Sequence, residues 1–135
     1  MKTLFVDTGG WMALADASDP AHTDCLRVRD TWLEKGGILL TSDYVMDETL
    51  TLIRMRIDLN AAEQWWGQVA ESPRLKWEWI YAGRAEKARA WFFRWTDKSF
   101  SFTDCTSFVL MRELHIHEVL TVDRHFLEAG FKIVP

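Results

Sequence analysis

The chain has few cysteines and no long apolar run. Its two cysteines, Cys25 and Cys105, show neither metal-site nor disulfide spacing, so we expect reduced thiols in a cytoplasmic protein. No stretch approaches the roughly 20 apolar residues that a membrane span requires, and no signal peptide precedes the first predicted strand. These absences argue against a disulfide-rich secreted domain and against a membrane as partner.

Several common catalytic motifs are also absent. The pair Gly9-Gly10 lacks the spacing and the lysine of a phosphate-binding loop, and no Ser/His/Asp or Cys/His arrangement stands out. No repeat, low-complexity tract or linker interrupts the 135 residues, which predicts one domain over residues 1–135. The formal net charge of −4 disfavours indiscriminate nucleic-acid binding, unless a local basic patch serves instead.

Strand-like and helix-like segments alternate along the chain. The continuous apolar run at residues 3–6 is typical of a strand buried on both faces of a parallel sheet. Further strands are predicted at 38–41, 76–80 (an outer strand), 118–122 and 131–134. Helices are predicted at 21–35, after Ser42, from Asn60 to Ser72, from Gly83 onward and after a Thr103 cap. This order predicts an α/β fold, a three-layer α/β/α sandwich with a mainly parallel central sheet.

Four carboxylates fall at one predicted edge of this sheet. Asp7 ends the first strand and Asp123 the penultimate one, Asp104 lies in the first turn of a helix, and Glu48 lies one turn into the helix after the second strand. Helices begin where strands finish, so all four places are at the carboxyl edge, where ligands bind in open α/β sheets. Crowded carboxylates raise one another's pKa values, and an oxygen-only cluster suits a hard divalent cation such as Mg²⁺.

Each acid also has an ordinary structural explanation. Asp7 and Asp123 could be turn residues, Asp104 a favourable charge at a helix start, and Glu48 part of a solvated helix face. Their coincidence at one edge favours the metal-site interpretation over four separate accidents. His125 follows Asp123 closely enough to reach the site, whereas His22, His115 and His117 are predicted to lie outside it.

With these motifs in order, the chain resembles the PIN-domain ribonucleases, and within them the toxins of the VapC type, over its whole length. The matching segments are Phe5-Val6-Asp7-Thr8 with Trp11, the stretch 44–53 around Glu48, the stretch 101–108 around Asp104, the stretch 120–126 around Asp123, and the end 130–135. Two departures occur: Asp47 adds an acid beside Glu48, and Gly9-Gly10 replaces the more usual Ser or Ala with a bulky neighbour. Neither removes a ligand.

The resemblance implies metal-dependent hydrolysis of RNA phosphodiesters. Asp7 and Asp104 would hold Mg²⁺ or Mn²⁺, Asp123 would bind it directly or through water, and Glu48 would orient or deprotonate the attacking water. Thr8 and Ser101 match hydroxyl positions that support the carboxylates. The resemblance also implies a toxin of a type II toxin–antitoxin system that forms a homodimer. A cognate antitoxin would pack on apolar surface, for which Trp65-Trp66 and the segment 91–95 are candidates, and would place a basic side chain in the acidic pocket.

Two other functions stay open. The first is a binding module that keeps the PIN fold without cleaving RNA. The second is a Mg²⁺-dependent phosphatase of another α/β family, such as the haloacid-dehalogenase-like enzymes, whose chemistry needs a second Asp two residues after the strand-end nucleophile. Gly9 stands at that place here. A ribonuclease assay with and without chelator separates these functions.

Basic residues recur near helical spacing on the helix predicted from Gly83 onward. They are Arg84, Lys87, Arg94 and, if the helix extends so far, Lys98, within an arc of roughly 80°, and Trp91 lies at its border. This stripe is either a solvated basic face or a surface that carries RNA phosphates toward Asp104. The second interpretation predicts that Arg84→Glu with Lys87→Glu weakens RNA binding with little loss of stability.

Overall fold

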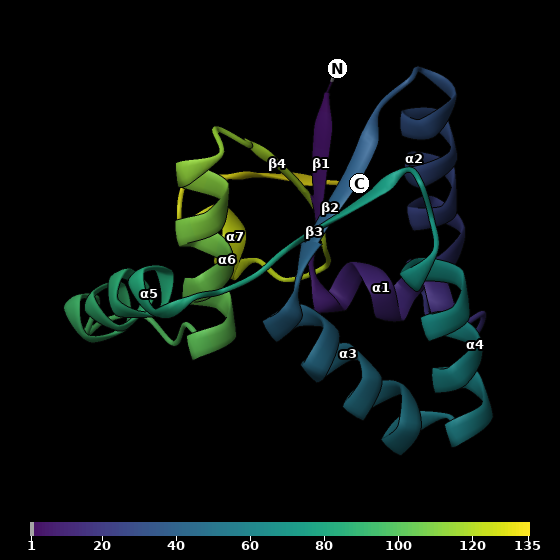
Figure 1. Cartoon of the computed structure of the whole chain (residues 1–135), viewed down its shortest axis with the longest axis horizontal. Helices are drawn as coiled ribbons and strands as arrows, with labels where there is room; N and C mark the ends of the chain where they lie inside the picture. Colours follow the sequence, from purple (N-terminus) through teal and green to yellow (C-terminus); the bar gives the residue numbers. More distant parts are fainter. Residues whose placement is uncertain (1) are drawn as a thin grey trace.

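The computed structural model, which describes residues 2–135, has a central sheet of five parallel strands (Figure 1). The strands are β1 (Thr3–Val6), β2 (Ile38–Ser42), β3 (Leu75–Glu78), β4 (Glu118–Leu120) and β5 (Lys132–Val134). Their order across the sheet is β3-β2-β1-β4-β5, and every pairing among the described residues is parallel. The predicted parallel sheet is therefore confirmed, with β3 at one edge as expected of the outer strand.

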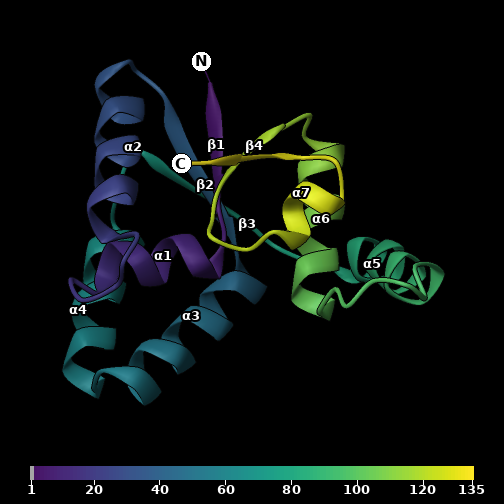
Figure 2. The same ribbon diagram turned by 180° about the vertical axis from the view of Figure 1, so that it is seen from behind.

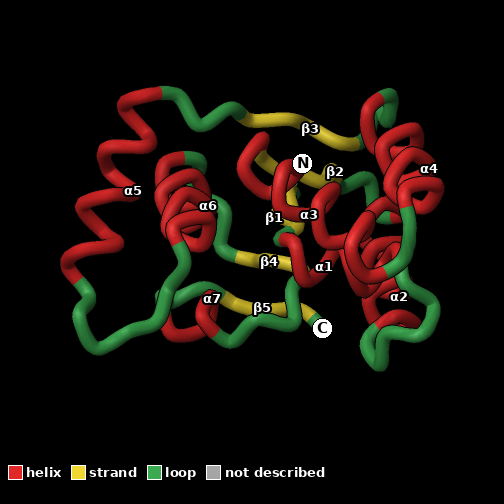
Figure 3. The backbone as a smooth tube through the Cα atoms, turned by 90° about the horizontal axis from the view of Figure 1, so that it is seen from below, coloured by secondary structure: helices red, strands yellow, loops and turns green. Residues whose placement is uncertain are grey.

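Helices cover both faces of the sheet. They are α1 (Thr8–Ala15), α2 (His22–Glu34), α3 (Asp43–Arg56), α4 (Leu59–Ala70), α5 (Ala82–Arg94), α6 (Phe102–Glu113) and α7 (His125–Glu128). Seen from below, α1, α2 and α4 lie on one side of the strands and α5, α6 and α7 on the other (Figure 3). The same two groups flank the sheet when it is viewed from behind (Figure 2). The three-layer α/β/α prediction is thus confirmed.

The most buried strand is β1, at the centre of the sheet. Leu4, Phe5 and Val6 are fully buried, and β1 pairs with β2 on one side and β4 on the other. On the far side of the sheet from α2, α6 is buried from Asp104 to Met111, and its middle, from Phe108 to Met111, is apolar all round. This core holds the carboxyl ends of β1 and β4 and the first turn of α6 in fixed relation.

Helix caps explain where three helices begin, and two of them differ from the prediction. Ser42 caps α3 as predicted, with its Oγ accepting from the Val45 N–H at 3.2 Å. The cap of α4 is Asp58, whose carboxylate accepts from the Ala61 N–H, so α4 begins before the predicted Asn60. The cap of α6 is Ser101 rather than Thr103. Asp and Ser side chains reach the orphan N–H groups of a first turn well, which favours these earlier starts.

The pair Gly9-Gly10 predicts a flexible turn from sequence, but in the structure it is part of α1, which begins immediately after Asp7. The helix crosses very close to β4: a Cβ on Gly10 would lie 2.2 Å from the Leu120 carbonyl oxygen. A glycine is needed there because no larger residue fits between α1 and the β4 backbone. This close approach brings the end of β4 against the end of β1, where Asp7 stands.

The basic stripe predicted on α5 is wrong at both ends. Its last residue, Lys98, lies beyond the helix, which ends at Arg94. Arg84 is buried, and it forms ion pairs with Glu78 of β3 at 2.9 Å and with Glu113 of α6 at 3.0 Å. Burial lowers the pKa of Arg84, but its hydrogen bonds to Glu113 and Glu78 outweigh this and raise it. Arg84 therefore fastens α5 to the sheet and to α6, whereas Lys87 and Arg94 remain exposed.

The spacing of Met46, Leu50, Ile53 and Ile57 predicts one apolar face on α3, and this prediction is only partly right. Ile53 is fully buried, Met46 and Leu50 are half-buried and Ile57 is exposed. The buried stripe runs through Val45, Thr49 and Ile53 instead. Both cysteines are buried free thiols, as predicted, and no helix within residues 2–135 has the length and apolar character needed to cross a bilayer.

Candidate active site

Asp7 stands where β1 passes into α1, and it is almost fully buried. One of its oxygens, Oδ2, accepts a hydrogen bond from the Thr121 hydroxyl at 3.1 Å. Burial, followed by the negative charge of Asp104, raises the pKa of Asp7 to about 7, although the Thr8 N–H and the Thr121 hydroxyl oppose this. A buried carboxylate with so high a pKa lies in an environment that lacks positive charge.

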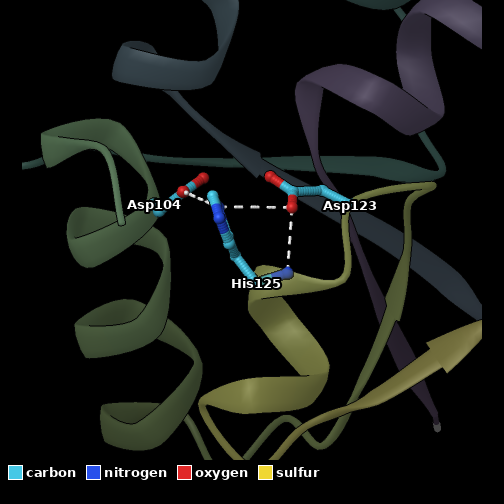
Figure 4. Close-up of side chains that lie close together, drawn as sticks. All are labelled: Asp104, Asp123 and His125. Carbon is cyan, nitrogen blue, oxygen red and sulfur yellow. Dashed lines mark hydrogen bonds and ion pairs between the residues drawn. The ribbon is translucent and has the colours of Figure 1, made fainter. Parts of the chain in front are cut away.

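Asp104 lies in the first turn of α6 and is locked by a capping box. The Asp104 N–H donates to the Ser101 hydroxyl at 2.9 Å, and its own Oδ2 accepts from the Ser101 N–H at 3.0 Å. The same Oδ2 lies 3.0 Å from the His125 Nδ1 (Figure 4). Burial raises the pKa of Asp104, and the charge of Asp123 adds to this rise. Because Oδ2 receives both contacts, Oδ1 is left for another partner.

Asp123 follows β4 in a turn that leads into α7. Its backbone N–H donates to the Thr121 hydroxyl at 3.0 Å, and its Oδ1 accepts from the His125 N–H at 2.9 Å. The Thr121 hydroxyl therefore donates to Asp7 and accepts from Asp123, which ties the two acids together. The predicted strand 118–122 ends earlier, at Leu120, because Thr121 and Asp123 are engaged in this turn.

Glu48 is half-buried on α3 and takes no part in the hydrogen bonds that join the other acids among residues 2–135. One turn before it, the Tyr44 ring lies 6.2 Å from the ring of Phe102, the first residue of α6. Residues four apart share a helix face, so Glu48 is on the face of α3 that is directed toward the start of α6. The structure thus brings Asp7, Asp104 and Asp123 together, whereas no hydrogen bond or ion pair among the described residues joins Glu48 to them.

His125 reaches the site, as its closeness to Asp123 indicated, although it was not among the four predicted site residues. Its Nδ1 lies 3.0 Å from Asp104 and 3.3 Å from Asp123, and its Nε2 lies 3.1 Å from the Ser99 hydroxyl. Burial lowers the pKa of His125, but the hydrogen bond to Asp104 and the charges of Asp123 and Asp104 outweigh this and raise it. One ligand atom from each of Asp104, Asp123 and His125 lies within 4.8 Å of the other two.

The two predicted supporting hydroxyls behave differently. Ser101 supports Asp104 through the capping box, as expected. The hydroxyl of Thr8 is buried beside Asp7 but makes no hydrogen bond among the described residues. Thr121 performs the supporting role instead. Its signal in the sequence is the Thr-x-Asp spacing, since a threonine hydroxyl commonly accepts from the N–H two residues on.

The donor set fits a hard divalent cation. Three carboxylates converge, and burial together with mutual repulsion raises the pKa of both Asp7 and Asp104. The unpaired hydroxyl of Thr8 and the unengaged Oδ1 of Asp104 add oxygen atoms without a partner. Oxygen ligands of this kind suit Mg²⁺ or Mn²⁺. A cation there would neutralise the charge that burial leaves uncompensated.

Millimolar Mn²⁺ is expected to raise the melting temperature at pH 8 and to do so much less at pH 5. The ion binds the ionised native cluster and hardly the unfolded chain, whereas Asp7, with a pKa of about 7, is protonated at pH 5, so protons compete with the ion. Scanning fluorimetry measures both shifts, and the Asp7→Asn/Asp104→Asn double variant is the control in which they vanish. An unchanged melting curve at pH 8 would contradict a preformed site.

Comparison with known proteins agrees with this geometry. The family model for the PIN domain matches residues 4–132. The chain is 34% identical over 128 residues to the 23S rRNA-specific endonuclease VapC20 of Mycobacterium tuberculosis, covering 95% of each chain. The crystal structure of that protein, described as a Sarcin-Ricin loop cleaving toxin, superposes with a TM-score of 0.88 at 33% identity and covers 98% of this chain and 99% of that chain.

Two more distant structures share the fold alone. VapBC2 from Rickettsia felis, solved with a DNA fragment from its promoter, has a TM-score of 0.73 at 9% identity and covers 97% of this chain and 96% of that chain. FitAcB from Neisseria gonorrhoeae has a TM-score of 0.66 at 11% identity and covers 98% and 96%. The family match over nearly the whole chain, with the relative at 34% identity, shows that this chain belongs to the PIN-domain family and, within it, to the VapC-type proteins.

Proposed function

We propose that this chain is a metal-dependent endoribonuclease, the toxin of a type II toxin–antitoxin system, that works in the cytoplasm as one domain. The observation that carries the proposal is the convergence of Asp7, Asp104 and Asp123, with the pKa of Asp7 raised to about 7 by burial and by Asp104. Such a cluster costs stability without a cation, so a binding role is its natural explanation. The likeness to an rRNA-specific endonuclease supports the reaction class.

In this proposal Asp7 and Asp104 hold Mg²⁺ or Mn²⁺, and Asp123 joins them directly or through water. The bound ion would neutralise charge on the scissile phosphate and lower the pKa of a water molecule. Glu48 on α3 would orient or deprotonate the attacking water. His125 and Ser101 hold the Oδ2 of Asp104, which leaves its Oδ1 available for the ion. Thr121 fixes the spacing of Asp7 and Asp123 by bonding to both.

The substrate class we propose is a structured ribosomal RNA, on the ground that the relative at 34% identity acts on 23S rRNA. For partners we propose a second copy of the chain and a cognate antitoxin. Both need apolar surface, and large exposed side chains are present on α3, α4 and α5, among them Met55, Trp66 and Phe93. A basic side chain of the antitoxin would find unneutralised carboxylates at the site.

The test is cleavage of 23S rRNA and of an unrelated RNA by the purified chain, with Mg²⁺, with Mn²⁺ and with excess chelator. We expect cleavage with either ion and none with chelator. A PIN-fold binding module would bind RNA without cutting it under any condition, and a phosphatase would release phosphate from a phosphate monoester while leaving RNA intact. Either result would overturn the proposal.

A further inference from the structure

A hollow of about 440 Å³ lies between α5 and the end of α6, outside the acidic site. Its lining contains three basic side chains and two tryptophans and no acid: Lys87, Ala90, Trp91, Arg94, Trp95 and Arg112. Residues 87, 91 and 94 are spaced at i, i+4 and i+7, so they share one face of α5. Arg112 reaches the same hollow from α6, and α5 and α6 lie side by side in both ribbon views.

The three basic side chains form no ion pair. No salt bridge within residues 2–135 includes Lys87, Arg94 or Arg112. Glu113 of α6 lies in the adjoining hollow with Lys87 and Arg112, but its ion pair is with Arg84. The Arg84 hydrogen bond lowers the pKa of Glu113, and the charge of Lys87 lowers it further. In a chain with a net charge of −4, three unpaired cations in one place form a site of opposite sign that is suited to an anion.

The tryptophans give the hollow flat apolar walls that are already ordered. The Trp91 ring packs 5.3 Å from the ring of Phe108, and the Arg112 guanidinium lies 5.3 Å from the Trp91 ring. Arg112 also donates to the Ala129 carbonyl at 3.3 Å, which holds it in place. Trp95 keeps 41% of its surface exposed, with the Arg94 guanidinium 5.3 Å from its ring. Exposed rings beside guanidinium groups are the elements that stack unpaired bases.

The hollow lies within reach of an RNA strand bound at the acidic site. Arg112 follows Asp104 along α6 by just over two turns, or roughly 12 Å at about 1.5 Å per residue. Phe92, the neighbour of Trp91, lies 6.0 Å from the ring of Phe102 at the start of the same helix. The α5–α6 surface thus leads from the carboxylates to the three cations.

We propose that this hollow is an RNA subsite that holds a nucleotide away from the cleavage position. Lys87, Arg94 and Arg112 contact its phosphates, and its base stacks on Trp95. The inference rests on the proposed function, which supplies RNA as the substrate. It also corrects the basic stripe predicted from sequence, because Arg112 takes the place of the buried Arg84. It explains how an acidic protein binds a polyanion: the phosphate contacts lie beside the acidic site rather than in it.

The test is binding of a fluorescently labelled single-stranded RNA of mixed sequence, measured by anisotropy in excess chelator at several salt concentrations. Lys87→Gln/Arg94→Gln should weaken binding and reduce the slope of log affinity against log salt by about 1.4, since each phosphate contact contributes roughly 0.7 for single strands. Trp95→Ala should weaken binding about ten-fold with the slope unchanged, and Trp95→Phe should retain most of the affinity.

The matched control is Arg27→Gln/Lys35→Gln, which removes the same charge from exposed positions of α2 and its C-cap on the other side of the sheet. Its salt slope should stay at the wild-type value. Equal losses in both double variants would mean that only net charge matters, and would overturn the subsite. Wild-type RNA binding by Lys87→Gln/Arg94→Gln would also overturn the subsite. If this variant instead lost self-association while its RNA binding stayed unchanged, the hollow would be a protein interface.

The two proposals fail separately. If the wild type cleaves RNA with Mg²⁺ while Lys87→Gln/Arg94→Gln binds and cleaves as well as it does, the ribonuclease stands and the subsite is wrong. If Lys87→Gln/Arg94→Gln and Trp95→Ala weaken RNA binding while no preparation cleaves RNA, the subsite stands and the ribonuclease proposal is wrong. For an active wild type, we expect the double variant to raise KM and to leave kcat within about two-fold, since it touches none of the carboxylates.

Discussion

Asp104→Asn is expected to reduce metal-dependent RNA cleavage at least 100-fold while leaving the fold intact. An amide keeps the shape of the capping box but removes the charge that a divalent cation requires, and a bound metal contributes several kcal/mol to transition-state stabilisation. Asp7→Asn should have the same effect, because Asp7 adjoins Asp104 closely enough for their charges to interact. Cleavage of labelled RNA in Mg²⁺, with circular dichroism to check folding, measures the loss.

Asp47→Asn is the matched control. Asp47 is exposed on α3 beside Glu48, so the substitution removes one negative charge from the same edge without touching the cluster. It should leave cleavage within about two-fold of the wild type, as surface changes away from a site usually do. Full activity in Asp104→Asn or Asp7→Asn, or an equal loss in Asp47→Asn, would refute the assignment of the site.

The same Asp7→Asn variant should melt higher than the wild type in chelator at pH 8. A folded-state pKa of about 7, raised by burial above the ordinary value, means that the stability contributed by protonated Asp7 is fully present only below about pH 4 and is lost as the pH rises through 7. At pH 8 the buried carboxylate is ionised and opposes folding, whereas asparagine is neutral. At pH 5 the difference in melting temperature between the variant and the wild type should shrink. A variant that melts lower than the wild type at pH 8 would contradict this prediction.

Arg84→Met is expected to lower the free energy of unfolding by about 3 kcal/mol, since removing one partner of a buried ion pair leaves the other charge uncompensated. Arg84 is 7% exposed, and it bonds Glu78, Glu113 and the Trp79 carbonyl at once. Its loss therefore loosens the attachment of α5 to both the sheet and α6. Urea denaturation followed by tryptophan fluorescence measures the change.

Arg89→Met on the same helix is the comparison for Arg84→Met. Arg89 is exposed, and its one ion pair within residues 2–135 is with Glu86, at 3.5 Å and one turn away. Such surface pairs contribute little. Its substitution should change the free energy of unfolding by less than about 0.5 kcal/mol. Similar values for the two variants would show that Arg84 does not fasten α5, and the earlier expectation that Arg84→Glu with Lys87→Glu costs little stability would then be restored.

Local patterns in the sequence predicted the order of the elements and the position of the acids well. The apolar run before Asp7 marks a central strand because a strand buried on both faces has no room for polar residues. Ser42 marks the start of α3 because its side chain satisfies a first-turn N–H. Asp7, Asp104 and Asp123 could be placed at one edge because each directly follows or begins an element of a parallel sheet, and parallel connectivity puts those ends together.

The sequence by itself thus determined the five strands, most of the helices between them and the ends that carry carboxylates, but it did not predict α7. Only the tertiary structure decided that Arg84 is buried between Glu78 and Glu113, that His125 reaches Asp104, and that Arg112 rather than Arg84 joins Lys87 and Arg94. The reason is physical. Helical periodicity says which residues share a face, but the partners of Arg84 come from β3 and α6, far away in the chain. Charge neutralisation depends on those neighbours, which packing alone brings together.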